Sequence, residues 1–339
     1  MNPSSRPLRI GILGAANIAR YFIKDVRASR KVSVEAVASR NLERGKAFAA
    51  ENGVPRVVPT YEALLADPAI DAIYNPLPTS LHAEWTIRAT DAGKHVLCEK
   101  PIAGSATEAR AMFEAARRNN VYVVEAYPYR AQPQTIKLRE LLDAKAIGRL
   151  QLVYASFCFA MSNASNIRLD PALAGGSLMD AGSYPISLAR MIAGERPVRV
   201  HAMARMAETG VDRTVVGSLE FASGLLAQIS CSFATVRYRQ AHIVGDAGLI
   251  ETTYHNDTSA TQPPIVNIRR GVGYDAPHES IETAAIGGFL AEAEAFQDLV
   301  HGGWDRWPGA TPEESIDIML TLDAVAASIR SSLPVAVGT

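Results

Sequence analysis

Three side chains in this sequence are of types that exchange protons with alcohols and carbonyls: Lys100, Asp180 and Tyr184. Lys100 follows an apolar run in "HVLCEKPIAG", and Tyr184 lies four residues after Asp180 in "GGSLMDAGSYPISLAR". On a helix, residues four apart share a face. Tyrosine ionises near ~10 in water and a neighbouring lysine favours the phenolate, so Tyr184 could donate and accept a proton. The alternative is a buried tyrosine beside a helix-capping aspartate, and the spacing alone favours neither.

Glu99 and Lys100 also have two interpretations. In the simpler one a strand ends, polar side chains meet water, and Pro101 starts a turn. In the other, Lys100 faces a ligand and Pro101 fixes its direction, with a cis Lys–Pro bond as one way to make the turn. The elements around these residues decide between the two.

Short apolar runs alternate with helical stretches from residue 8 to about residue 125. The runs are "LRIGIL", "VSVEAVA", "AIDAIY", "HVLCE" and "VYVVEA". Nearly continuous apolar strands separated by helices predict a parallel sheet covered on both faces. Ligands bind at the carboxyl ends of such strands. Glu99 and Lys100, at the end of "HVLCE", are therefore expected at the ligand-binding edge.

Longer strands, several of which alternate apolar with polar residues, begin at about residue 148. They predict a mostly antiparallel sheet with one face on a core and one free face, a candidate dimer surface. The weakly charged stretch Thr214 to Val236 contains the turn "FASG" and is predicted to be a β-hairpin, not a membrane helix. We expect an α/β protein with a Rossmann domain (doubly wound parallel sheet), residues 1–126, followed by an α/β domain with a large, open, mostly antiparallel sheet, residues 127–339.

The 339 residues carry a net charge of −1, which gives no reason to expect a nucleic acid or a membrane as partner. Cys98, Cys158 and Cys231 are odd in number and widely spaced, so they are expected to be reduced and buried. We recognise no signal peptide and expect a soluble, cytoplasmic protein. The histidines lack metal-ligand spacing, and no metal is expected.

The stretch "LRIGILGAANIARYF" has the strand–turn–helix order of a dinucleotide-binding unit. Aligned on the G-x-G-x-x-G fingerprint, Gly14 is the first glycine, while Ala16 and Ala19 replace the second and third. Alanine is small enough for the backbone to approach a pyrophosphate at the helix N-terminus. The motif is degenerate, but it lies in the first strand–helix turn of an alternating domain, and a bound dinucleotide is therefore predicted.

The second predicted strand ends in Ser39 and Arg40, with Arg44 one turn further on. A Rossmann domain that binds NAD usually has an acidic residue here for the ribose hydroxyls. A hydroxyl and a guanidinium instead suit a 2′-phosphate, and Arg40 could stack on adenine. The alternative is that these arginines are ordinary surface charges. The missing acid favours NADP over NAD.

The segments "GILGAANIA", "PLPTSLHAEWTIRATDAGKHVLCEKP" and "GGSLMDAGSYPISLAR" resemble the Gfo/Idh/MocA oxidoreductases. The likeness covers nearly the whole chain and is nearest to the D-xylose dehydrogenase and dimeric dihydrodiol dehydrogenase branch. It implies a Rossmann domain, an α/β domain for substrate binding and dimerisation, and NADP-dependent hydride transfer at a sugar or cyclic diol carbon. A homodimer, or a dimer of dimers, through the open sheet is implied as well.

The resemblance also assigns roles to individual residues. Lys100 corresponds to the family's essential lysine, Asp180 to its aspartate and Tyr184 to its acid–base tyrosine, where inositol-type members have histidine. Arg168 lies where the branch approaches its substrate, with a structural role as the alternative; Asp180 is assigned to substrate binding too. The cofactor-binding residues assigned from the motifs and the resemblance are Gly14, Ala16, Asn17, Ile18, Ser39, Arg40, Arg44, Leu77, His82, Glu99 and Lys100.

The sequence departs from the branch near the presumed substrate pocket. Ala131 and Gln132 stand where an aromatic residue and a histidine are common, and Tyr127 and Pro128 replace a more usual Phe and Met. Three other functions stay open: a keto-sugar reductase, an NAD-dependent glycosidase on the same fold, and a non-catalytic NADP sensor. Ser39 with Arg40, the absence of the glycosidase group's histidine, and the intact proton-transfer set argue against the last two.

Overall fold

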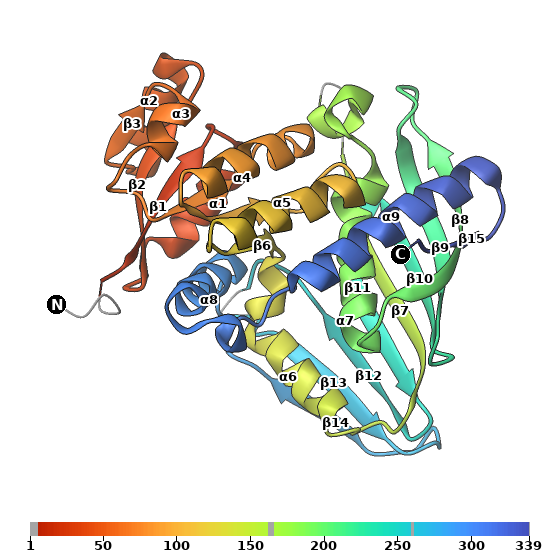
Figure 1. Ribbon diagram of the computed structural model, residues 1–339. Coiled ribbons are helices and arrows are strands. Elements are labelled where there is room, and N and C mark those ends of the chain that lie inside the picture. The colour runs from red at the N-terminus through yellow and green to blue at the C-terminus, as the bar shows by residue number, and fades with distance from the viewer. Residues whose placement is uncertain (1–5, 162–165, 259–260, 339) are drawn as a thin grey trace. The chain divides into compact units, whose positions relative to one another are not determined.

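The structure is a computed structural model that describes residues 6–161, 166–258 and 261–338. The chain divides into two compact units. The first comprises Met1–Gln132 and Ile286–Pro312, and the second Pro133–Ala285 and Glu313–Thr339. This division differs from the expected one after residue 126, because a late segment of the chain belongs with the first unit. Figure 1 labels the elements of both units.

The first unit contains a six-stranded parallel sheet, as the alternating pattern predicts. Its strands are β1 (Leu8–Leu13), β2 (Val32–Ala38), β3 (Arg56–Val58), β4 (Ala72–Asn75), β5 (His95–Glu99) and β6 (Val123–Ala126). The order β3-β2-β1-β4-β5-β6 is that of a doubly wound sheet, with its reversal between β1 and β4. Its helices are α1 (Asn17–Val26), α2 (Leu42–Asn52), α3 (Tyr61–Leu65), α4 (His82–Asp91), α5 (Ala106–Arg118) and α8 (Gly288–Gly302), with short 3₁₀ turns η2 (Thr79–Leu81), η3 (Pro128–Ala131) and η7 (Trp304–Arg306).

Helix α8 completes the core of the first unit although it lies about 160 residues after β6. Phe22 of α1 stacks on Tyr74 of β4, with ring centroids 4.1 Å apart, and meets Phe289 of α8 edge-on at 6.3 Å. Phe296, also on α8, is fully buried in the same cluster. The aromatic residues of α8 thus cover apolar surface that the N-terminal segment alone would leave exposed.

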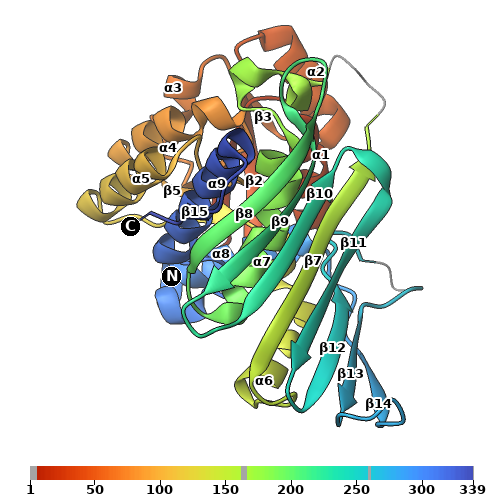
Figure 2. The same ribbon diagram turned by 90° about the vertical axis from the view of Figure 1, so that its right-hand side faces the viewer.

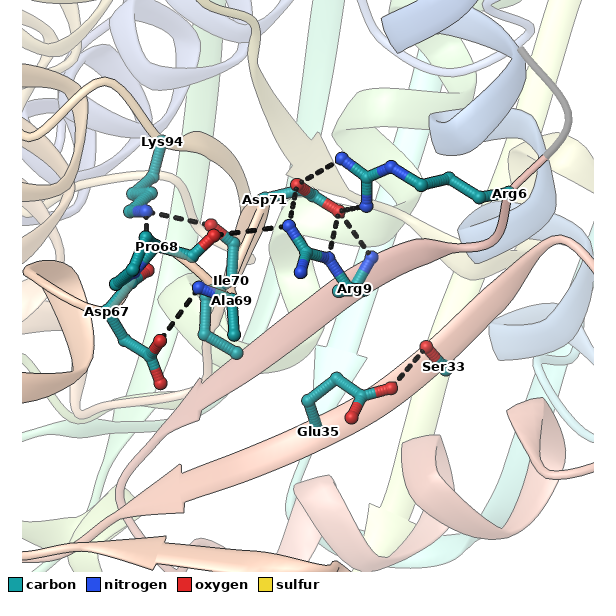
Figure 3. Close-up of polar contacts among 10 residues, drawn as sticks. All are labelled: Arg6, Arg9, Ser33, Glu35, Asp67, Pro68, Ala69, Ile70, Asp71 and Lys94. Atoms are coloured by element: carbon teal, nitrogen blue, oxygen red, sulfur yellow. Dashed lines mark hydrogen bonds and ion pairs between the residues drawn. The ribbon is translucent and has the colours of Figure 1, made fainter. Parts of the chain in front are cut away.

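The amino-terminal edge of this sheet is held by an ionic cluster (Figure 3). The carboxylate of Asp71 accepts hydrogen bonds from Arg6 at 2.6 and 2.9 Å and from the side chain of Arg9 at 2.9 and 3.0 Å. Lys94 donates to two carbonyl oxygens of the preceding turn at 2.8 and 2.7 Å. Burial alone would raise the pKa of Asp71, but the bonds from Arg9 and Arg6 outweigh it and hold that pKa well below its usual value. This cluster lies at the opposite end of the strands from the ligand-binding edge.

The second unit contains a nine-stranded, mostly antiparallel sheet, again as predicted. Its strands are β7 (Leu150–Ala160), β8 (Pro197–Met206), β9 (Asp212–Phe221), β10 (Leu226–Ser232), β11 (Ala234–Gly245), β12 (Gly248–Thr253), β13 (Ile265–Arg270), β14 (His278–Glu282) and β15 (Val335–Ala336). They are ordered β14-β13-β12-β11-β7-β10-β9-β8-β15, with β7 and β10 parallel. The helices are α6 (Pro133–Asp143), α7 (Ser183–Ala193) and α9 (Pro312–Ser331), with short turns η4 (Ile167–Leu169), η5 (Pro171–Leu173) and the π-helical η6 (Leu178–Gly182).

One face of this sheet is turned to the viewer in Figure 2, with α7 behind the strands. Tyr154, Met203, Val216 and Leu226 are exposed, and the pairing of β7 to β10 puts all four on one face. Strands β9 and β10 form the predicted hairpin across the "FASG" turn. Among the described residues, no helix is long and apolar enough to cross a membrane.

Candidate active site

The turn after β1 has the conformation of a phosphate-binding turn. Gly14 has φ +81°, and its N–H donates to the carbonyl of Ala38 at 2.8 Å. A Cβ here would lie 3.0 Å from the Leu77 side chain and 3.3 Å from the Tyr61 hydroxyl. Glycine is therefore required both for the backbone angle and for the space, as the fingerprint predicts. Leu77 packs directly on this turn.

The N-terminus of α1 is open to an anion. Ala16, in the N-cap position, offers no side-chain acceptor, and the first turn, which begins with Asn17 and Ile18, carries no acidic residue. Ala19 is fully buried against the core. The first backbone N–H groups of a ten-residue helix are thus not capped by its own side chains, an arrangement that fits a pyrophosphate.

Basic side chains lie at the end of β2, where the adenosine end of a dinucleotide would bind. Ser39 is buried, whereas Arg40 and Arg44 are exposed. Arg44 donates to the carbonyl of Ala15 at 3.2 Å, which connects the start of α2 to the Gly14 turn. Burial raises the pKa of Tyr61, and the positive charges of Arg40 and Arg44 oppose that shift. Both cations therefore lie near the turn that Tyr61 contacts, and this donor set fits a phosphorylated ribose.

Glu99 and Lys100 end β5 and lead into a turn. The carboxylate of Glu99 accepts a hydrogen bond from the Tyr74 hydroxyl at 2.6 Å and one from the Lys100 N–H at 3.3 Å. The Lys100–Pro101 peptide bond is cis, as considered above. Glu99 is 7% exposed and Lys100 is half-buried. Glu99 thus holds the backbone of the turn from within, while Lys100 lies at the carboxyl edge of the sheet.

His82 connects this turn to the loop after β4. Its Nε2 lies 2.7 Å from the carbonyl oxygen of Leu77, and its Nδ1 lies 2.9 Å from that of Pro101. The ring is 1% exposed, and burial lowers the pKa of His82 despite the two carbonyl partners. The structure thus places this histidine between a cofactor-side loop and the lysine turn, with both ring nitrogens directed at protein backbone.

In the second unit, Asp180 lies on η6 and pairs with Arg168. The Arg168 Nε donates to the carboxylate at 2.7 Å. The backbone of Arg168 also passes close to Gly175, where a Cβ would lie 2.6 Å from the Arg168 carbonyl oxygen. This ion pair is compatible with both roles considered for Arg168, substrate binding and a structural role.

Tyr184 lies on the first turn of α7, one turn after Asp180. A π-helical turn, Leu178–Gly182, contains Asp180, and α7 continues from Ser183 onward. Tyr184 is 4% exposed, and its hydroxyl accepts a hydrogen bond of 3.0 Å from the side-chain amide of Asn256. The edge of its ring meets Phe157 at 5.0 Å between centroids. The position of the phenol oxygen is thus fixed by a hydrogen bond from an amide.

Two family models match most of the chain. Residues 8–127 match the model of an oxidoreductase family with an NAD-binding Rossmann fold, and residues 135–251 match the GFO/IDH/MocA C-terminal domain. The chain belongs to the Gfo/Idh/MocA oxidoreductase family.

Relatives of this oxidoreductase are known with several activities. It is 36% identical to D-xylose 1-dehydrogenase (NADP(+)) 2 of Haloferax volcanii, covering 97% of this chain and 99% of the relative. It is 35% identical to the trans-1,2-dihydrobenzene-1,2-diol dehydrogenase of Danio rerio, over 73% and 75% of the two chains. A 3-ketoreductase from Actinomadura kijaniata, solved in complex with NADP and TDP-benzene, superimposes with a TM-score of 0.85 at 30% identity, over 95% and 98%.

Two groups around the tyrosine of this oxidoreductase were not found from the sequence. Arg239, on β11, is 4% exposed, and its guanidinium carbon lies 4.2 Å from the centroid of the Tyr184 ring. The other is Asn256, which donates to the Tyr184 hydroxyl. In the sequence, Arg239 is one of three charged or polar residues in "RYRQ", and no local pattern marks it as buried. Only the pairing of distant strands brings it to the tyrosine.

A buried glutamate of the oxidoreductase was also missed. Glu292, on α8, is 1% exposed. Burial raises the pKa of Glu292 well above its usual value, and the nearby carboxylates of Glu99 and Glu125 raise it further. Glu125 accepts from the Ile102 N–H at 2.9 Å, beside the lysine turn. Burial and the two neighbouring carboxylates thus favour the protonated form of Glu292.

The departures from the branch lie in and beside η3 of the oxidoreductase. Tyr127, Pro128 and Ala131 are all buried. Gln132 is buried too and donates to the carbonyl of Ile286 at 3.1 Å, which fixes the segment leading into α8. These side chains therefore contribute to the core of the first unit.

The candidate residues thus fall into two groups. The first unit brings together the Gly14 turn, Leu77, His82 and the Glu99–Lys100 turn at one sheet edge, with Ser39 and its arginines at the end of β2. The second unit brings together Asp180, Arg168 and Tyr184. A single site containing both Lys100 and Tyr184 stays a prediction from the sequence.

Proposed function

We propose that this oxidoreductase is an NADP-dependent dehydrogenase that transfers hydride between nicotinamide and a sugar or cyclic diol carbon. The observation that carries the proposal is the Tyr184 hydroxyl, which is held by an amide donor one turn after the Asp180–Arg168 pair. The dehydrogenase relatives act, by name, on D-xylose and on a dihydrodiol. Their substrates share a secondary alcohol or hemiacetal carbon beside further hydroxyls.

In the proposed reaction, NADP held by the cofactor-binding residues would supply the nicotinamide for hydride transfer. When an alcohol is oxidised, its C–H bond is broken as the hydride leaves, and its hydroxyl proton passes to the Tyr184 oxygen. Lys100 favours the phenolate of Tyr184 and binds the substrate oxygen. Asp180 accepts a hydrogen bond from another substrate hydroxyl and orients the sugar. These roles require Lys100 and Tyr184 to face one substrate.

The proposed cofactor residues lie in two places, the Gly14 turn with the N-terminus of α1 and the basic end of β2. Gly14 and the N-terminus of α1 would hold the pyrophosphate, with Ala16, Asn17 and Ile18 in its first turn. Ser39, Arg40 and Arg44 would hold the 2′-phosphate, which favours NADP. His82 and Glu99 would act by holding the loop of Leu77 and the turn of Lys100.

A keto-sugar reductase is the second candidate, because one structural relative is a 3-ketoreductase. It would use the same residues in reverse, with Tyr184 donating a proton to the carbonyl oxygen as hydride arrives. An NAD-dependent glycosidase is disfavoured by the basic end of β2.

We also propose that two copies associate through the open face of the nine-stranded sheet. Tyr154, His201 and Leu226 line a shallow depression on it, and Met203 and Val216 are exposed beside them. An exposed apolar face of this kind suits a homodimer. Analytical ultracentrifugation of the wild type and of Met203→Glu tests this: a monomeric wild type would overturn it.

The central experiment follows reduced-cofactor absorbance with pentoses, hexoses, cyclic diols and keto sugars, with NADP and NAD in parallel. We expect turnover with NADP and one of these classes. Tyr184→Phe should lower kcat by about 10²-fold or more while NADP binding is retained. Lys100→Met should act similarly. Lys137→Met is the matched control, because Lys137 is a lysine of α6 that pairs with Glu140. Full activity of Tyr184→Phe would overturn the proposal, as would product release with no net change in the cofactor.

A further inference from the structure

Arg239 is enclosed by aromatic rings in the interior of the second unit. Its guanidinium carbon lies 4.2 Å from the centroid of Tyr184, 4.4 Å from Phe157 and 4.7 Å from Tyr254. The rings come from three separate parts of the chain, and the Tyr254 hydroxyl is fixed to the carbonyl of Ser156 at 2.7 Å. Burying a cation is costly unless other groups replace water. Here cation–π contacts with the faces of three rings replace part of the water, and a guanidinium group is well suited to such stacking.

The same guanidinium orients the amide that contacts Tyr184. An Nη2 of Arg239 donates to the Asn256 Oδ1 at 3.2 Å. A guanidinium group can only donate hydrogen bonds, so the amide atom of Asn256 that contacts Arg239 must be the oxygen. The amide atom that contacts Tyr184 must then be the nitrogen. That NH₂ donates to the Tyr184 hydroxyl oxygen at 3.0 Å. Arg239 therefore acts on the phenol in two ways, over its ring and through Asn256.

We propose that Arg239 and Asn256 are positioning residues that prepare Tyr184 for proton transfer. The inference rests on the proposed function. In that function Lys100 favours the phenolate of Tyr184, and Arg239 and Asn256 would favour it too, from within the second unit. A positive charge over the ring and a hydrogen bond donated to the oxygen both stabilise the phenolate more than the phenol. The phenolate is the form that accepts the proton of an alcohol, so both groups favour oxidation.

Other titratable groups lie near Tyr184 and Asn256 along the chain. Asp180, which pairs with Arg168, comes one turn before Tyr184, and His255 precedes Asn256. Burial lowers the pKa of His255, and the charges of Arg239 and Arg237 lower it further, so His255 is neutral at pH 7. Arg239 is thus the cation that contacts the Tyr184 ring and also acts on the neighbouring imidazole.

The test follows the ionisation of Tyr184 itself, in the full chain without substrate. Tyrosines carry ¹³C at Cζ, and the Tyr184 signal is assigned by its loss in Tyr184→Phe. The wild type is compared with Arg239→Met, Arg239→Lys and Asn256→Asp. We expect the titration midpoint of Tyr184 to rise by about one pH unit or more in Arg239→Met and Asn256→Asp. Arg239→Lys keeps the positive charge but loses the planar guanidinium that stacks on the rings and bonds Asn256. Its midpoint should therefore lie between those of the wild type and Arg239→Met.

Two comparisons separate this effect from general ones. Arg237→Met removes a cation from the same strand at an exposed position and should leave the midpoint within about a third of a unit. Tyr274, which is 100% exposed, gives an ordinary tyrosine signal in every sample. Should Arg239→Met fail to fold, Asn256→Asp decides, because Asn256 is only half-buried.

Equal midpoints in the wild type and Asn256→Asp would overturn the proposal, as would a wild-type Tyr184 that stays protonated until the protein unfolds. The result is independent of the substrate. Normal turnover with unchanged midpoints would reject the role of Arg239 and Asn256 alone. Shifted midpoints in a protein that turns over no sugar or diol would instead reject the proposed function.

Discussion

The carboxylate of Asp180 accepts a 2.7 Å hydrogen bond from the Nε of Arg168, twelve residues earlier in the chain. The pair leaves Asp180 19% and Arg168 41% exposed, so both remain accessible to a bound sugar. Arg168 thus acts on a substrate either directly or by holding Asp180 in place, and the two roles give different kinetics.

We expect Asp180→Asn to lower kcat/KM by about 10- to 100-fold, because a charged hydrogen bond to a substrate hydroxyl is lost. Arg168→Ala should have a smaller effect. If Arg168 acts through Asp180, the double variant should be no worse than Asp180→Asn alone. Steady-state kinetics of the three variants measure this, and effects that multiply would indicate a separate contact between Arg168 and substrate.

Arg40 should determine the choice of cofactor. We expect Arg40→Ala to weaken NADP about 10- to 100-fold and NAD less than about threefold, because only NADP has the 2′-phosphate. Fluorescence titration of each cofactor gives both dissociation constants. Lys46→Ala is the matched control, since Lys46 is an exposed cation on α2 paired with Glu43. Equal weakening of both cofactors would count against a phosphate contact.

Asp71 should make the first unit sensitive to acid. The pKa of Asp71 is held below its usual value, so its stabilising contribution is present at neutral pH and is lost as the pH falls below about 3.8. Asp71→Asn should therefore cost about 2 kcal/mol at pH 7 and progressively less below pH 4. Trp85, Trp304 and Trp307 all belong to the first unit, so tryptophan fluorescence in urea follows this unit. A penalty that is the same at pH 7 and pH 3 would contradict the ionic role of Asp71.

Glu292 should have the opposite pH dependence. Its pKa is raised in the folded chain, so the folded state binds the proton more tightly than the unfolded state. Stability is then lost as the pH rises above the usual glutamate value of 4.5. Glu292→Gln removes this dependence, so its stability relative to the wild type should increase as the pH rises above 4.5, by the same tryptophan measurement. Glu294→Gln, on the same helix, is the control. A difference in stability that does not change with pH would show that the pKa of Glu292 is not raised in the folded chain.

The local residue pattern determined the parallel sheet, the antiparallel sheet and the Gly14 turn. Each depends on short-range chemistry: apolar runs, glycine at a left-handed backbone position, and small residues at a helix N-terminus. For the same reason the end of β5 could be placed at the ligand-binding edge before any tertiary contact was known. The motifs that carry the family resemblance lie within these segments.

The tertiary structure decided what distant segments contribute. Helix α8 enters the core of the first unit and brings Glu292 near Glu99 and Glu125. The pairing of β7 with β11 sets Arg239 opposite Phe157, where its guanidinium also contacts the Tyr184 ring. The residue type alone does not show whether a charged side chain, such as Arg239 or Glu292, is buried or exposed. What distinguishes the two cases is the loss of water around the side chain, and that loss depends on which strands and helices pack together.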